Sequence, residues 1–472
     1  MKKEQVIYAT IFWSAFVALL AGCSFFMVHN AAWLFGDEAI VYGTTGMGKA
    51  FSPLGFDGMI DSYGRFYPFA YNLYNVLLLF GDGQISAEAH YILQAVALCI
   101  LATCLAFTGL HVLKNYSAAW KYSITFCFVA IAVFRVYPEF VTCYTGMWIV
   151  FMLLAVFILC TCKFEDTEHW GWGIPAILAV TYICYCYENI CVIPVAYGAC
   201  SLLFNYKNLS QNKKWFNGLL VASGLLFLFL YAVIVLPRAT HFYGHHTETS
   251  IFYNAFRLFI AHKIYWVAII FLCIRIWDVF RNKKPYLYAD SFLLAAFAYF
   301  CGTAFLHLDF VYYYNIGVLL ALTAIICYCK DYLKPNWALL LMLALCAFYG
   351  RKMPSTIKKN QQDRINSSTQ IMKLANYVQE GVNLYWYAPE YEDSAEYLLD
   401  LRSCSRYSTR TYIEWYLQKD IEIAEQSTFD TNLSGIWLNP DQNNTLFPKS
   451  DSIFSCLDTV YHAGSATGYL VK

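Results

Sequence analysis

Long apolar runs recur along most of this chain and constrain its fold more than any other feature. About eleven runs are long enough to cross the roughly 30 Å of hydrocarbon in a bilayer, because a helix rises about 1.5 Å per residue. They cover approximately residues 6–28, 88–113, 120–137, 140–161, 171–187, 190–205, 216–236, 263–280, 288–306, 311–329 and 336–350. Only 14% of the residues are charged, whereas soluble domains contain about 25%. We therefore expect a polytopic α-helical membrane protein with about eleven transmembrane helices.

The basic residues between these runs set the orientation of the chain. Cytoplasmic connections of membrane proteins carry an excess of Lys and Arg, and here that excess falls in every second connection. The residues concerned are Lys2, Lys3, Lys114, Lys121, Lys163, Lys207, Lys213, Lys214, Arg281, Lys283, Lys284, Lys330 and Lys334. This pattern predicts a cytoplasmic N-terminus and places everything after Arg351 on the outer side of the membrane.

The composition changes abruptly near residue 352, where charged and amide side chains replace apolar ones. We expect residues 1–352 to form a transmembrane domain and residues 353–472 to form a small extracytoplasmic α/β domain. Helices are expected at about 362–380 and 391–401, with a strand at 383–388 between them. The aromatic content stays high in this tail, which favours a folded domain over disorder.

Net charge and cysteine placement exclude some classes of protein. A formal net charge of zero argues against a nucleic-acid partner. Most of the 18 cysteines lie inside apolar runs, where they act as small hydrophobic residues. Only Cys404 and Cys456, both in the polar tail, are candidates for a disulfide. Residues 20–23 also fit a lipoprotein signal with Cys23 as the lipidated terminus, but with so many spans after it the first helix needs no separate export role.

The first outward loop, residues 30–75, contains the most informative polar pair of the chain. Asp37 and Glu38 follow shortly after the first helix. Two adjacent carboxylates at a membrane surface attract protons, cations or hydroxyl groups, and lipid anchoring alone does not require them. The same loop has tyrosines at helical spacing, which form either an interfacial aromatic belt or a stacking wall for a sugar or prenyl chain. These are Tyr63, Tyr67, Tyr71 and Tyr74.

Further ionisable residues fall at the predicted outer ends of the helices. Such groups are costly near hydrocarbon, so they generally pair with one another or serve a function. They are Arg135, Glu139, Glu188, Arg238, His262, Lys263, His307, Asp309, Arg351 and Lys352, in addition to Arg65 of the first loop. His241, His245 and His246 could bind a metal together with Glu248, although a solvated loop of histidines is the simpler interpretation.

The order of features at the start of the chain is also informative. A short cytoplasmic start and one helix precede an outward loop that opens with Asp37 and Glu38 and continues through an interfacial segment. This plan resembles the GT-C superfamily of membrane glycosyltransferases, including protein O-mannosyltransferases and lipid A aminoarabinose transferases. The stretch GRFYPFAYNLYNVLLLFG at 64–81 is similar to bacterial members that decorate surface polysaccharides. The resemblance implies a GT-C-like fold in a bacterial inner membrane.

The resemblance also implies roles for individual residues. The first-loop acid of that superfamily acts as a base, and Asp37 occupies the matching position. It would take the proton of an acceptor hydroxyl as that hydroxyl attacks a sugar carried on a polyprenyl phosphate. Glu38 would hold Asp37 or the acceptor, or it is simply a carboxylate at a helix start. A cation would stabilise the departing phosphate. The candidates are Arg65, Arg238, Lys263 and Arg351, with Glu139, Glu188 and Tyr63 as further substrate contacts.

We therefore expect an inverting glycosyltransferase in the lipid bilayer, with a lipid-linked sugar donor and an extracytoplasmic glycan or lipid acceptor. No cofactor is expected to be required. A second acidic motif of some relatives is reduced here to Glu139 alone, which argues against a metal-dependent mechanism and leaves a divalent metal as an open alternative.

Other functions fit parts of the sequence. A polysaccharide polymerase or ligase would depend on basic residues of the outward loops, such as Arg238 and Arg257. A lipid-linked-saccharide transporter or flippase would place charges near the bilayer midplane, whereas Arg135 and Arg275 fall close to the ends of their helices. A structural or sensory protein that binds partners through its tail is a further alternative.

Overall fold

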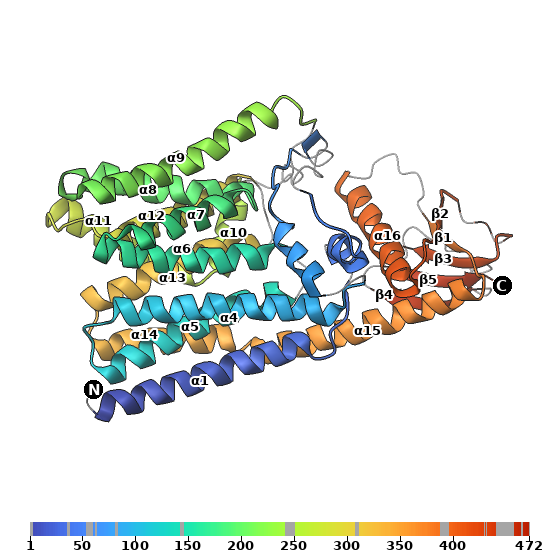
Figure 1. Cartoon of the computed structure of the whole chain (residues 1–472), viewed down its shortest axis with the longest axis horizontal. Helices are drawn as coiled ribbons and strands as arrows, with labels where there is room; N and C mark the ends of the chain where they lie inside the picture. Colours follow the sequence, from blue (N-terminus) through green and yellow to red (C-terminus); the bar gives the residue numbers. More distant parts are fainter. Residues whose placement is uncertain are drawn as a thin grey trace.

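The fold is a bundle of long helices joined to a smaller region that contains a β-sheet (Figure 1). It was obtained as a computed structural model. The structure describes residues 3–34, 38–52, 60–61, 64–80, 84–141, 146–240, 251–306, 311–387, 396–428, 430, 432–439, 457–463 and 466–471.

In the part of the chain that the structure describes, each apolar run predicted to be a membrane helix is mainly helical. The helices of the bundle are α1 (Lys3–Val28), α4 (Ala87–Val112), α5 (Ala118–Val141), α6 (Met147–Thr167), α7 (Trp170–Cys184), α8 (Val192–Asn205), α9 (Gln211–Ile234), α11 (Ile264–Ile276), α12 (Tyr288–Phe305), α13 (Val311–Tyr332) and α14 (Pro335–Gly350). Within the described residues, 8 helices are long and apolar enough to cross a membrane, or up to 9 if the bent pair formed by α10 (Ile251–Ala261) and α11 counts as one span. The protein is thus an integral membrane protein.

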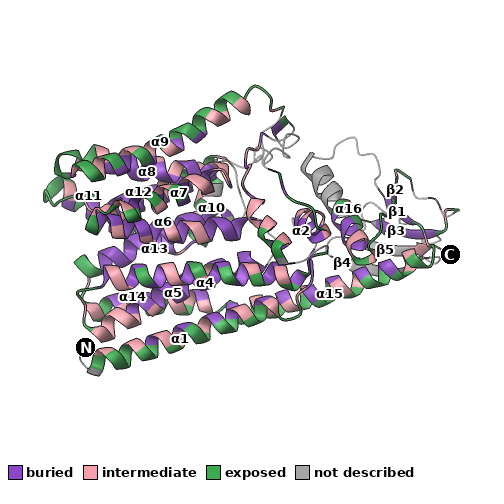
Figure 2. Cartoon of the chain, in the orientation of Figure 1, coloured by how far each residue is buried: buried purple, intermediate pink, exposed green. Residues whose placement is uncertain are grey.

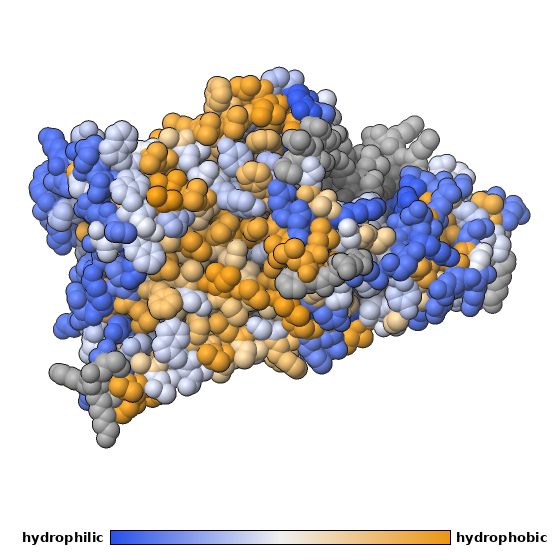
Figure 3. All heavy atoms as spheres, in the orientation of Figure 1, coloured by the Kyte–Doolittle hydropathy of each residue, from blue (hydrophilic) through white to orange (hydrophobic). Residues whose placement is uncertain are grey.

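The distribution of side chains agrees with a lipid surrounding. Apolar atoms cover the sides of the bundle, while hydrophilic atoms gather at its end and over the sheet region (Figure 3). α13 and α5 lie inside the bundle and bury most of their residues, whereas α1 and α9 lie at its edge and expose theirs (Figure 2). Apolar residues on the outside of such a bundle are stable because they contact lipid tails.

One predicted boundary was wrong. The break expected between 120–137 and 140–161 lies later, because α5 continues past Pro138 to Val141. The Nδ2 of Asn360 donates to the carbonyl oxygen of Val141 at 2.5 Å and so satisfies a free carbonyl at the end of this helix. Glu139 consequently belongs to the last turn of α5 and not to the turn that follows.

The C-terminal region has the expected α/β character. It consists of α15 (Met353–Gln379), β1 (Leu384–Tyr387), α16 (Glu396–Leu417), β2 (Ile423–Gln426), β3 (Gly435–Asn439), β4 (Leu457–Ala463) and β5 (Ala466–Val471). The strand order is β2-β1-β3-β5-β4, with β1 parallel to β2 and β3, and with β5 antiparallel to β3 and β4. The strand predicted at 383–388 is confirmed as β1. The division of the chain at residue 352 stays a prediction.

Short elements of the first loop lie between the bundle and the C-terminal region (Figure 1). They are α2 (Glu38–Tyr42), η1 (Thr45–Met47) and η2 (Asn72–Phe80). The remaining short elements are η3 (Glu188–Cys191), η4 (Tyr206–Asn208) and the π-helical η5 (Trp277–Arg281). This arrangement puts α2 against α16.

Candidate functional site

Glu38, the first residue of α2, is buried at the end of the bundle that adjoins the C-terminal region, with 1% of its surface exposed. Its Oε2 accepts a hydrogen bond from the backbone N–H of Leu34 at 2.7 Å, and its Oε1 accepts one from the hydroxyl of Tyr91 at 2.6 Å. His90 Nε2 lies 3.7 Å from the same Oε1. These contacts hold the carboxylate in one place.

The electrostatic surroundings keep Glu38 ionised. Burial alone raises the pKa of its carboxyl, but the hydrogen bond and charge of His90, with the bonds from Leu34 and Tyr91, lower this pKa below its ordinary value. The imidazole of His90 stacks on the ring of Tyr74 with 5.4 Å between centroids, so aromatic packing fixes the partner of Glu38 as well. We conclude that Glu38 is a fixed negative charge.

Arg364 of α15 joins this cluster from the other side. Its guanidinium lies over the ring of Tyr91, 3.8 Å from the centroid. Its Nη1 donates to the carbonyl of Met27 at 2.5 Å, at the C-terminal end of α1. A helix C-terminus carries partial negative charge, which a cation stabilises. Arg364 therefore ties the end of α1 to the residue that binds Glu38.

α16 covers the first loop. The hydroxyl of Tyr42 donates to the carbonyl of Ser408 at 2.6 Å. Trp33 meets Trp415 edge to face, with ring centroids 6.1 Å apart, and Gln84 Nε2 donates to the carbonyl of Trp415 at 2.6 Å. The C-terminal region is thus part of the structure that positions the loop.

Some predicted site residues lie outside the described residues. These are Asp37 and Tyr63, and also the histidines His241, His245 and His246 with Glu248, His307 and Asp309. On either side of Asp37, the backbone N–H of Leu34 donates a hydrogen bond to Glu38 Oε2. Cys456 also lies outside the described residues, so its pairing with Cys404 stays a prediction.

Two predicted residues that are far apart in the sequence, Arg65 and Glu188, form an ion pair. Arg65 Nε lies 2.8 Å from Glu188 Oε1, and Arg65 Nη2 lies 3.3 Å from Oε2. The backbone N–H of Phe66 donates to the same Oε1 at 2.8 Å. Burial lowers the pKa of Arg65, but the Glu188 carboxylate outweighs this effect and raises that pKa above its ordinary value. The pair joins the first loop to η3.

Arg238 is also paired, just after the C-terminal end of α9. Its Nε lies 2.8 Å from Asp61 Oδ1 in the first loop. The backbone N–H of Thr240 donates to the carbonyl of Asp61 at 2.8 Å, and the hydroxyl of Tyr231 donates to the carbonyl of Gly64 at 2.7 Å. Arg238 and Asp61 are both well exposed, so this ion pair adds little stability by itself.

Glu139 takes part in a buried polar group inside the bundle. Asn315 Nδ2 of α13 donates to Glu139 Oε1 at 2.9 Å. One turn earlier in α5, Arg135 Nη2 lies 2.8 Å from Nδ1 of His262, which is fully buried. Sequence analysis named Arg135, Glu139 and His262 but not Asn315, and the packing of α5 against α13 and against the break between α10 and α11 creates these two pairs.

Lys263 and Arg351 lie at the surface. Lys263 Nζ donates to the carbonyl of Ile260 at 2.6 Å, and the Arg351 guanidinium lies over the ring of Phe348, 4.5 Å from its centroid. Within the described part of the chain, no ion pair joins either cation to Glu38 or Glu188. The same part contains no group of three or more His, Cys, Asp or Glu residues that could hold a metal ion.

His90, Tyr91 and Arg364 were missed by sequence analysis. The first two belong to an apolar helix, where a single polar residue reads as ordinary packing, and Arg364 is one of many charged residues in α15. The sequence did contain one signal for His90 and Tyr91: they are a polar pair in the first turns of an otherwise apolar helix. Such positions lie at the membrane surface, where polar residues often serve a function.

No protein-family model and no curated protein matches this chain. Among solved structures, it is similar to ArnT from Cupriavidus metallidurans bound to undecaprenyl phosphate. The TM-score is 0.54, and the alignment covers 98% of this chain and 98% of ArnT at 11% sequence identity. The chain has a GT-C-type fold. This confirms the predicted fold class, and at this identity the likeness concerns the fold alone.

Proposed function

We propose that this protein is a membrane glycosyltransferase that moves a sugar from a polyprenyl-phosphate donor to an extracytoplasmic glycan or lipid. The observation that carries the proposal is the likeness of its fold to that of ArnT along 98% of both chains. The ArnT structure contains undecaprenyl phosphate, the lipid that carries the sugar in the proposed donor. The N-terminus would be cytoplasmic and the C-terminal region outside a bacterial inner membrane.

Asp37 is the proposed base. The acceptor oxygen attacks the anomeric carbon, the bond from that carbon to the phosphate oxygen breaks, and Asp37 takes the acceptor proton. Attack opposite the phosphate inverts the anomeric centre. Glu38 has a positioning role in this proposal, because its two oxygens are already bonded to Leu34 and Tyr91 inside the protein.

The cations of the outer face would stabilise the departing phosphate. Lys263 and Arg351 are the more available of the four candidates, since Arg65 and Arg238 each pair with a carboxylate. Glu139, Glu188 and Tyr63 remain proposed substrate contacts. No step of this scheme requires a metal. If transfer did require a divalent cation, a chelator would abolish it.

Replacement of Asp37 tests the mechanism. We expect Asp37→Asn to lower transfer by about 10²–10⁴-fold, the usual contribution of a general base, while the protein remains folded in the membrane. The assay is release of undecaprenyl phosphate from a panel of undecaprenyl-phosphate sugars by protein in lipid nanodiscs, with envelope glycans and lipids as acceptors. Glu88→Gln, at an exposed acid in the first turn of α4, is the control. Unchanged release by Asp37→Asn contradicts the mechanism, and a loss confined to Arg238→Ala would favour a polymerase or ligase.

A further inference from the structure

Tyr91, near the start of α4, links the first loop to the C-terminal region. Its hydroxyl donates to Glu38 Oε1 at 2.6 Å, and the guanidinium of Arg364 lies over its ring, 3.8 Å from the centroid. Arg364 belongs to α15 and donates in turn to the carbonyl of Met27, at the end of α1. The side chain of Tyr91 therefore joins α4 to α15 and to the start of α2.

The side chains of this cluster have almost no surface that a substrate could contact. Tyr91 and Arg364 are 0% exposed, and Glu38 is 1% exposed. His90, whose Nε2 lies 3.7 Å from Glu38 Oε1, is also fully buried. A group without accessible surface acts on a reaction only through its neighbours. Any part that this cluster plays in transfer is therefore to position other groups.

The segment held by the cluster is the one that carries the proposed base. Glu38 Oε2 accepts a hydrogen bond from the backbone N–H of Leu34 at 2.7 Å, so Tyr91 and Leu34 fix the two oxygens of one carboxylate. Asp37 directly precedes Glu38 in the sequence, and consecutive Cα atoms are about 3.8 Å apart. The place of Glu38 thus limits where Asp37 can lie.

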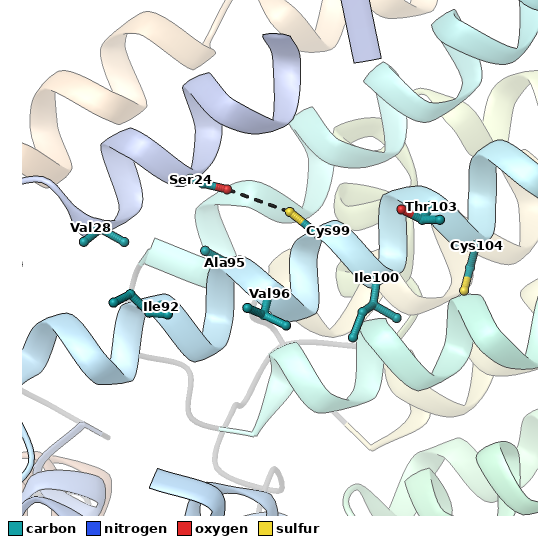
Figure 4. Close-up of a pocket in the computed structure, with 9 residues that line it drawn as sticks. All are labelled: Ser24, Val28, Ile92, Ala95, Val96, Cys99, Ile100, Thr103 and Cys104. Atoms are coloured by element: carbon teal, nitrogen blue, oxygen red, sulfur yellow. Dashed lines mark hydrogen bonds between the residues drawn. The ribbon is translucent and has the colours of Figure 1, made fainter. Parts of the chain in front are cut away.

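The contact between α1 and α4 beside Tyr91 does not supply a comparable hold. The groove between these helices includes Ile92, the next residue, and Val28, and most of its wall is apolar (Figure 4). The hydrogen bond drawn there joins Ser24 to Cys99 at 3.9 Å. Apolar contact is not directional. The bond from Tyr91 to a carboxylate is directional and is among the stronger kinds of hydrogen bond.

The C-terminal region holds the chain on both sides of this segment. Before it, Gln361 Nε2 of α15 donates to the carbonyl of Phe26 at 2.8 Å. After it, the hydroxyl of Tyr42 donates to the carbonyl of Ser408 of α16 at 2.6 Å. These two bonds join residues that are 335 and 366 positions apart in the sequence. The place of the segment therefore depends on the fold of the C-terminal region.

We propose that Tyr91 is a positioning residue for the proposed base, and that the C-terminal region sets the place of residues 34–38 through Tyr91. This inference rests on the proposed function for the role of Asp37. It gives the C-terminal region a part in the transfer reaction itself. Such a part is costly to lose, because a displacement of about 1 Å from the productive geometry lowers a rate by about 100-fold.

Removal of the Tyr91 hydroxyl tests this role. Tyr91→Phe keeps the ring beneath Arg364 and deletes only the bond to Glu38. For release of undecaprenyl phosphate by protein in nanodiscs, we expect kcat to fall by about 10- to 100-fold. The KM for the donor should stay within about twofold, because the contacts with substrate are unchanged. A rise in KM with an unchanged kcat would overturn the proposal, since the cluster would then act on binding.

Tyr328→Phe is the matched control. The hydroxyl of Tyr328 in α13 donates to Asp290 Oδ1 of α12 at 2.7 Å, and both residues are buried. Its removal breaks the same kind of bond in neither the first loop nor the C-terminal region. Tyr328→Phe should lower the midpoint of thermal unfolding about as much as Tyr91→Phe does, and it should leave kcat unchanged. Equal losses of kcat would contradict a positioning role, because they would reflect stability alone.

Hydrogen–deuterium exchange separates a failure of this inference from a failure of the proposed function, because it needs no substrate. In Tyr91→Phe we expect peptides that cover residues 34–42 to exchange about tenfold faster than in wild type, since the lost bond is to a charged group. Tyr328→Phe should leave their exchange unchanged. Unaltered exchange in Tyr91→Phe would overturn the inference. Faster exchange in that variant, with no transfer by wild type from any donor, would overturn the proposed function and leave Tyr91 a purely structural role.

Discussion

At the residue scale, Glu38 shows how a surface carboxylate of the sequence becomes an internal one in the fold. Sequence analysis placed Glu38 in the first loop, because polar residues between long apolar runs have few other places to lie, and the structure shows it at the start of α2. Sequence analysis did not predict that Glu38 would bond to Tyr91, because that contact joins residues 53 positions apart. Only the packing of the loop against α4 creates it.

The Glu38 contacts predict a pH-dependent contribution to stability. Glu38→Gln should lower the free energy of unfolding by about 1–3 kcal/mol at neutral pH, because the amide keeps an acceptor oxygen but loses the charge facing His90 and Tyr91. Since the folded-state pKa of Glu38 is lowered, this contribution is complete above the unfolded-state pKa of about 4.3. It is lost as the pH falls through the folded-state pKa.

Thermal unfolding of the purified protein at several pH values measures this difference. The gap between wild type and Glu38→Gln should stay constant from neutral pH down to about pH 5 and shrink below about pH 4.3. Glu88→Gln, an exposed acid in the first turn of α4, is the control and should cost little at any pH. A gap that widens on acidification would show that Glu38 is not held ionised.

At the element scale, the sequence predicts helices much better than it predicts their contacts. Each long apolar run is mainly helical where the structure describes it, because backbone groups in lipid must bond within their own segment. The end of α5 was misplaced because Pro138 resembled a helix end, whereas Asn360 caps the helix three residues later, across a separation of 219 positions. Such long-range caps leave no periodic trace in the sequence. α15 provides two of them, with Asn360 on α5 and Arg364 on α1.

Arg364 gives a prediction about how α15 holds the bundle. Arg364→Ala should lower the free energy of unfolding by about 2–4 kcal/mol, because it leaves buried carbonyls at the end of α1 without a donor and removes the cation over Tyr91. Arg364→Lys should lose less, since it keeps the charge and one donor. The measurement is thermal unfolding in detergent, with the exposed Lys358→Ala on the same helix as control. Equal stability of Arg364→Ala and Lys358→Ala would refute this role.

At the scale of the whole molecule, the first loop is enclosed by two parts of the chain that the sequence separates by hundreds of residues. α4 contacts it through Tyr91 and Glu38, and α16 contacts it through pairs such as Tyr42 with Ser408 and Trp33 with Trp415. The alternation of basic connections predicted which loops share a side of the membrane, but it carried no information on this enclosure. Both proposals depend on the enclosed side being the outer one.

Surface labelling of single introduced cysteines decides the orientation. Lys358→Cys in α15 should react with a membrane-impermeant maleimide in intact spheroplasts, because the positive-inside rule places the C-terminal region outside. Lys283→Cys, in the basic connection between η5 and α12, should react only after the membrane is permeabilised. Both variants are made with Cys404→Ser and Cys456→Ser, which remove the two cysteines of the C-terminal region; nine of the free cysteines that the structure describes are buried. The reverse pattern would put Glu38, Tyr91 and Arg364 on the cytoplasmic side. An extracytoplasmic acceptor could then not reach the first loop.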